Sequence, residues 1–85
     1  MKIFPPLTAV TPLSDYKLAL TFGENENRLY DFKPNLSHKY YSVLVDIKLF
    51  NSVSVVNGEI KWITGQDFCP HTLFIKSVQH DLRKT

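Results

Sequence analysis

The sequence predicts an α+β fold, in which a single small antiparallel β-sheet of four to five strands packs against one or two short helices. Large apolar side chains alternate with small or polar ones over residues 17–22, as in a half-buried strand. The pair Asn57-Gly58 separates two further short runs and is typical of a type I′ hairpin turn, which needs positive φ at both central residues. Between these two regions, residues 36–50 carry apolar side chains near helical spacing.

The first predicted hairpin pairs residues 17–22 with residues 28–32 across a polar loop. A short strand is expected before it, over residues 7–10. Pro12 should confine that strand to a sheet edge or end it, because proline cannot donate to a ladder. The side chains expected on the core side of the hairpin are Leu18, Leu20, Phe22, Tyr30 and Phe32.

The helical region is expected to begin near Leu36, with Ser37 as its cap, and to run for two to three turns. A last short turn should place Phe50 under the sheet. The second hairpin then pairs residues 53–56 with residues 59–62. The side chains assigned to the inner face of the helix are Tyr40, Tyr41, Leu44 and Ile47.

Length and composition indicate one globular domain over residues 1–85, with a flexible tail expected from about residue 80. Hydrophobic residues make up 44% and charged residues 21% of the chain, which is too apolar for a disordered protein. The formal charge of +2 is spread along the sequence, so nucleic-acid binding is not expected. Only the end is locally basic, with His80, Arg83 and Lys84.

Cysteine usage and hydropathy predict the compartment. A single Cys excludes an internal disulfide. No stretch approaches the roughly 18 apolar residues that a membrane span requires, and residues 1–5 hold no signal-peptide run. We therefore expect a cytoplasmic protein without a membrane partner.

Most residues of chemical interest lie between residues 60 and 74, which hold the only Trp and the only Cys. A strand over residues 60–62 should break at a glycine, and a new helical turn should begin only after a proline, because the residue before proline avoids helical geometry. The residues selected as a partner-binding or functional loop are Trp62, Gly65, Asp67, Pro70 and His71.

Each of these side chains also has an ordinary structural role. Asp67 follows a glycine, where a carboxylate most often accepts backbone N–H groups and locks the turn. Trp62 is expected in the core. Cys69 is expected as a small buried side chain, although His71 two positions on could activate a thiolate. The histidines lack a second ligand type at a matching interval, so neither a metal nor another cofactor is expected.

The same residues carry a resemblance to a known family. An alternating strand over residues 16–22 precedes a return that ends in residues 30–32 and a helical region that leads to Phe50. The pattern then continues with Trp62, Gly65, Asp67, Pro70, Thr72, Leu73 and Phe74. This order is similar to the small bacterial family catalogued as domain of unknown function 2442, from about Pro6 to Ser77.

The resemblance implies a small α+β domain, sometimes fused to a helix-turn-helix module. It also implies a gene encoded beside another small family of unknown function, in pairs that resemble toxin and antitoxin units. No activity comes with it. Relatives commonly carry an acidic residue after the proline, where this chain has His71, so a carboxylate pair with Asp67 is not available here.

These observations favour a protein that is not an enzyme. The expected function is a non-catalytic protein-interaction or regulatory domain, the antitoxin-like partner of a small co-encoded protein, which it covers through a sheet edge or an aromatic patch. Pairing of two copies through a sheet edge is a further expectation. The alternative is a small enzyme or ligand-binding domain that uses Asp67, Cys69 and His71, and a third interpretation is nucleic-acid binding through the basic tail.

Overall fold

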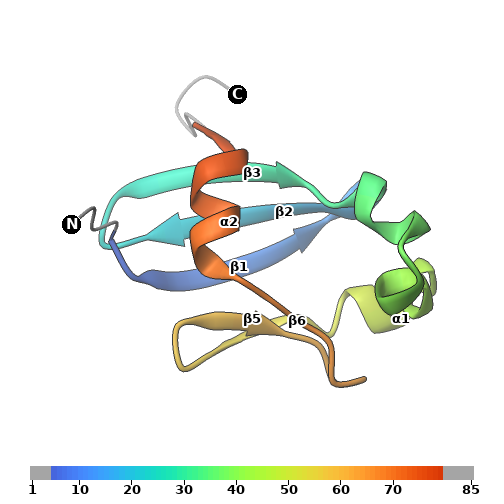
Figure 1. Cartoon of the computed structure of the whole chain (residues 1–85). Helices are drawn as coiled ribbons and strands as arrows, with labels where there is room; N and C mark the ends of the chain where they lie inside the picture. Colours follow the sequence, from blue (N-terminus) through green and yellow to red (C-terminus); the bar gives the residue numbers. More distant parts are fainter. Residues whose placement is uncertain (1–4, 80–85) are drawn as a thin grey trace.

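The computed structural model describes residues 5–79 and confirms the α+β class. Its strands divide between two antiparallel sheets, in place of the single sheet expected (Figure 1). The four-stranded sheet has the order β1-β2-β3-β7, and the three-stranded sheet has the order β4-β5-β6. The bounds are β1 Leu7–Leu13, β2 Lys17–Phe22, β3 Glu26–Asp31, β4 Ser54–Val56, β5 Glu59–Lys61, β6 Asp67–Phe68 and β7 Val78–Gln79.

The division has a physical cause in the chain between the sheets. Residues 33–50 form a helical layer that separates β3 from β4 in the sequence. Pro12 lies in β1, at one edge of the four-stranded sheet, and it has no N–H with which to extend the ladder to a further strand. The expectation that Pro12 marks an edge is therefore confirmed.

The first hairpin is confirmed, and its side chains face as expected. β2 pairs with β3 from Lys17 opposite Asp31 to Phe22 opposite Glu26, so the connecting loop is shorter than expected. The side chains on the core side of β2 and β3 are buried, namely Leu18, Leu20, Phe22 and Tyr30, and Phe32 just after β3 is buried with them.

The helical region differs from the single helix of two to three turns. It consists of two 3-10 helices, η2 (Lys33–Ser37) and η3 (Lys39–Val45), and one α-helical turn, α1 (Ile47–Phe50). Tyr41 and Leu44 turn inward at a spacing of three residues, which is the 3-10 period, and the β-branched residues of η3 disfavour an α-helix. Phe50 is buried, as expected.

The caps of these short helices also differ from the expectation. Ser37 is the last residue of η2 and does not cap a helix start. Instead, His38 Nδ1 accepts the N–H of Tyr40 at 3.1 Å, and the Asp46 carboxylate accepts the N–H of Lys48 at 3.0 Å. Each cap satisfies a donor that the first helical turn leaves free.

Helix α2 (Pro70–Lys76) crosses the face of the sheet formed by β1, β2 and β3 (Figure 1). Leu73 on its inner side is buried, and the Phe74 ring lies edge-to-face with Phe22 at 5.0 Å between centroids.

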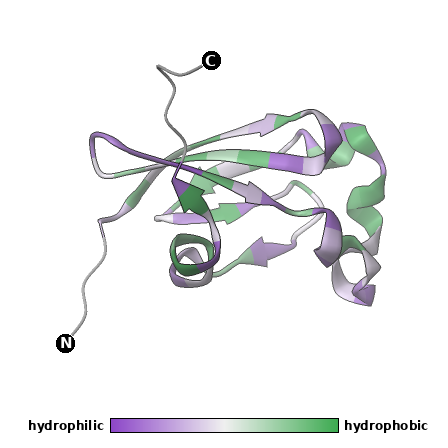
Figure 2. Ribbon diagram, turned by 90° about the horizontal axis from the view of Figure 1, so that it is seen from above, coloured by the Kyte–Doolittle hydropathy of each residue, from purple (hydrophilic) through white to green (hydrophobic). Residues whose placement is uncertain are grey.

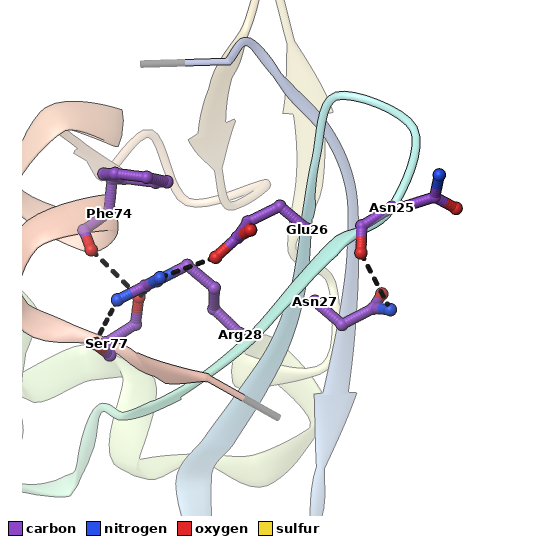
Figure 3. A network of polar contacts seen from close by, with 6 residues as sticks. All are labelled: Asn25, Glu26, Asn27, Arg28, Phe74 and Ser77. Carbon is purple, nitrogen blue, oxygen red and sulfur yellow. Dashed lines mark hydrogen bonds and ion pairs between the residues drawn. The ribbon is translucent and has the colours of Figure 1, made fainter. Parts of the chain in front are cut away.

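Arg28 on β3 holds the end of this helix (Figure 3). Its guanidinium lies 4.6 Å from the Phe74 ring centroid, donates to the Ser77 hydroxyl and carbonyl, and pairs with Glu26 at 2.7 Å.

The second hairpin has the turn geometry that its sequence predicts. Asn57 has φ 53° and Gly58 has φ 80°, so both central residues of the turn lie in the left-handed region. β4 and β5 pair with Val55 opposite Ile60. Ile60 and Trp62 are buried on the same face, as expected.

Gly58→Val is expected to lower the free energy of unfolding by about 1–3 kcal/mol, because valine is strained at positive φ. No heavy atom lies within 4 Å of an added Cβ, so the loss would come from the backbone and not from a clash. Asn57→Gly is the control and should cost little, since glycine accepts the same φ. Urea unfolding measures both variants, and a wild-type midpoint for Gly58→Val would contradict the type I′ turn.

Candidate functional site

Trp62 belongs to the core and not to a contact surface. Its side chain is 3% exposed, and its indole Nε1 donates to the Phe50 carbonyl at 3.0 Å. Its ring packs against Phe32 at 5.1 Å between centroids. The expectation that Trp62 is buried is confirmed, and its ring lies against Phe32, just after β3, and Phe50 of α1.

The turn after β5 is closed by the backbone and not by a carboxylate. Gly65 has φ 100°, its N–H donates to the Trp62 carbonyl at 2.9 Å, and the Trp62 N–H donates to the Gln66 carbonyl at 3.0 Å. Asp67 is exposed in β6, and among residues 5–79 its carboxylate has no hydrogen bond that could lock the turn. The turn-lock role expected of Asp67 is therefore wrong, because two backbone hydrogen bonds perform it.

Cys69 is exposed, which corrects the expectation that it is buried. Alternation along the chain turns Phe68 inward and Cys69 outward just before α2. The pKa of the thiol is lowered, first because the backbone N–H of Thr72 bonds to the sulfur and also because that of His71 does so. Pro70 is the first residue of α2 and Cys69 is extended, as expected.

His71 is exposed in the first turn of α2. Within residues 5–79, no group of three or more His, Cys, Asp or Glu side chains could hold a metal ion. The use of Asp67, Cys69 and His71 by an enzyme or ligand-binding domain stays a prediction. The basic tail with His80, Arg83 and Lys84, and the expected flexibility from residue 80, lie outside the described residues.

The structure reveals an exposed apolar surface, two of whose residues, Tyr40 and Ile47, were expected on the inner face of the helix. Four apolar side chains of η3 and α1 are 40–53% exposed, and we call them the apolar strip: Tyr40, Val43, Val45 and Ile47. They are half of the exposed large hydrophobic residues in the described chain. Figure 2 shows hydrophobic residues, in green, along this helical segment.

The 3-10 geometry explains why Tyr40 and Val43 of the strip face solvent. Residues three apart are eclipsed on a 3-10 helix, so Tyr41 and Leu44 form an inner row while Tyr40 and Val43 form an outer one. The predicted α-helical period grouped Tyr40 with the inner residues, and that assignment was wrong. The spacing of three between Tyr41 and Leu44 fits both helix types, so the sequence held no signal that could have corrected it.

Three aromatic side chains attach this segment to the sheets through backbone carbonyls. Tyr16 donates to the Val45 carbonyl at 2.5 Å, and Tyr41 donates to the Asp67 carbonyl at 2.9 Å. The third attachment is the bond from Trp62 to Phe50. Burial raises the pKa of Tyr41, so its hydroxyl stays protonated and able to donate.

The turn that presents Tyr16 has an unusual backbone. Asp15 and Tyr16 both have positive φ, at 61° and 60°, which is strained for residues other than glycine. The Asp15 carboxylate pairs with Lys33 and Lys17, and these contacts, led by the hydrogen bond from Lys33, lower its pKa. The Tyr16 ring lies edge-to-face with Phe50 at 5.2 Å.

Comparisons with known proteins give one match. The sequence model of the family described as "Protein of unknown function (DUF2442)" matches residues 7–78. No curated protein matches the chain. No solved structure matches it either. Within residues 5–79, none of the helices is both long enough and apolar enough for a membrane span.

Proposed function

The chain belongs to the DUF2442 family, and we propose that it is a non-catalytic protein-interaction domain whose partner is another small protein. The finer part of the proposal is a regulatory role as the antitoxin-like member of a co-encoded pair. The partner binds to the apolar strip. The observation that carries the proposal is the exposure of Tyr40, Val43, Val45 and Ile47 within one short segment.

The four exposed side chains lie close together in the sequence, within residues 40–47. Single exposed apolar residues are normal on a protein surface, whereas neighbouring ones mark interaction sites. Tyr40 adds a large ring with a polar tip, which is the kind of side chain that contributes most at protein interfaces. A partner that covers the strip removes apolar surface from water at four side chains together.

The attachments of the segment support the same proposal. Hydrogen bonds from Tyr16, Tyr41 and Trp62 hold η3 and α1 against both sheets, so the strip is presented on a preorganised backbone. Preorganisation reduces the conformational entropy that binding must offset. The Tyr41 hydroxyl also occupies the Asp67 carbonyl of β6, which competes with strand addition at that position.

Retention of a partner from a lysate of the native cell tests the proposal. Immobilised wild-type protein should retain one small protein in stoichiometric amount, and Val45→Ser/Ile47→Ser should lose at least about nine-tenths of it. The control is Val56→Ser/Ile75→Ser, which removes two exposed apolar side chains outside the strip. Thermal unfolding of each variant shows that the domain is still folded.

Two outcomes would contradict the proposal. The wild-type protein could retain no stoichiometric partner. Alternatively, the folded Val45→Ser/Ile47→Ser variant could retain the partner as well as the control does. In either case the exposure of the apolar strip would not serve partner binding.

A further inference from the structure

Two lysines flank the apolar strip, and they indicate the chemistry of its partner. Lys39 directly precedes Tyr40, and Lys48 directly follows Ile47. Both lysines are exposed. Within residues 5–79 neither forms an ion pair, whereas Lys17, Lys33 and Arg28 are each paired with a carboxylate. Each end of the strip therefore carries a lysine without an ion pair.

The one carboxylate within residues 39–48 does not cancel these charges. Asp46 uses its Oδ1 to accept the N–H of Lys48, and so caps α1. Two lysines and one aspartate leave this segment with a formal charge of +1. Asp15, in the turn that presents Tyr16, forms ion pairs with Lys17 and Lys33.

We infer that the partner presents apolar side chains flanked by carboxylates, which would lie over the strip with the acidic groups opposite Lys39 and Lys48. This inference rests on the proposed function. Protein interfaces place charged groups at a polar rim around an apolar centre, and complementary rim charges guide encounter and select partners. The order lysine, apolar strip, lysine matches that arrangement along η3 and α1.

A second copy of this chain fits the same surface less well. A two-fold dimer would place the strip against itself, and each copy would bring Lys39 and Lys48 to the shared rim. Like charges at a contact raise its free energy. A different protein with acidic flanks avoids this repulsion.

The test extends the retention experiment with charge variants. Lys39→Glu/Lys48→Glu should weaken retention of the partner by about tenfold or more, because attraction at both ends becomes repulsion. Lys61→Glu/Lys76→Glu is the control, since it changes the net charge by the same amount at two exposed lysines outside the strip. The lysate is treated with nuclease, and a sodium chloride gradient should release the partner from wild type at moderate salt.

The outcomes separate the inference from the proposed function. If Val45→Ser/Ile47→Ser loses the partner while Lys39→Glu/Lys48→Glu keeps it, the inference that the partner has acidic flanks is contradicted. The proposed function as an interaction domain is then still supported. If the Val45→Ser/Ile47→Ser variant keeps the partner, the proposed function fails first. The inference would also be overturned if nuclease removes the retained species. It would likewise be overturned if size-exclusion chromatography shows a wild-type dimer that the Val45→Ser/Ile47→Ser substitutions dissociate.

Discussion

Trp62→Ala is expected to lower the free energy of unfolding by about 3–5 kcal/mol, the range for removing a large aromatic side chain from a core. Trp62 is 3% exposed and packs between the rings of Phe32 and Phe50. The truncation also removes the shorter of two hydrogen bonds to the Phe50 carbonyl and leaves only the N–H of Val53, at 3.4 Å. A domain of this length has a total stability of roughly 4–13 kcal/mol, so the loss is a large share of the total and unfolds the domain if the total lies near the lower end.

Urea unfolding followed by far-UV circular dichroism measures this loss, because the alanine variant has no tryptophan to report by fluorescence. Trp62→Phe is the control. It keeps a ring in the core but removes the Nε1 donor, and should cost about 1–3 kcal/mol. The wild-type emission should be blue-shifted. Emission like that of free tryptophan, together with a wild-type midpoint for Trp62→Ala, would refute burial of this residue.

The strands of the two hairpins were predictable because their signals are local, whereas β6 and β7 were not predicted. A period of two along residues 17–22 places Leu18 and Leu20 on one face whatever the rest of the chain does. The turn at Asn57-Gly58 follows from the φ values that those two residues tolerate. The division into two sheets is not local, because it depends on where the helical layer of residues 33–50 lies relative to both hairpins.

The helical layer was the least predictable part. Its apolar residues are dense enough to fit either a 3-10 or an α-helical period, and only the inward packing of Tyr41 and Leu44 selects the former. The error placed Tyr40 and Ile47 in the core, whereas both are exposed. It therefore also hid the apolar strip, which is the main feature of the candidate site.

For the loop around Asp67, the local backbone was predictable but the contacts with distant residues were not. Residue types and spacing placed the helix start at Pro70 correctly. They could not show that the hydrogen bond to Asp67 goes to its carbonyl and comes from Tyr41, 26 residues away in the sequence. They also could not show which side of the chain Cys69 faces, because that depends on how β6 enters α2.

Phe32→Ala is the second large effect, with an expected loss of about 3–5 kcal/mol. Phe32 is fully buried just after β3, where the first sheet meets the helical layer and the second sheet. Its N–H also donates to the Tyr16 carbonyl at 2.9 Å. The rings that contact Phe32, with centroids 5.1–6.2 Å away, are Tyr30, Tyr41, Phe50, Trp62 and Phe68.

Phe32→Leu separates the contribution of these ring contacts from that of burial. Leucine keeps most of the apolar volume and loses the edge-to-face and tilted ring pairs, so its cost should be about 1–2 kcal/mol. Urea midpoints should therefore fall in the order wild type, Phe32→Leu, Phe32→Ala. Equal midpoints for the two variants would contradict the role of volume, because alanine leaves a cavity between the two sheets that leucine fills.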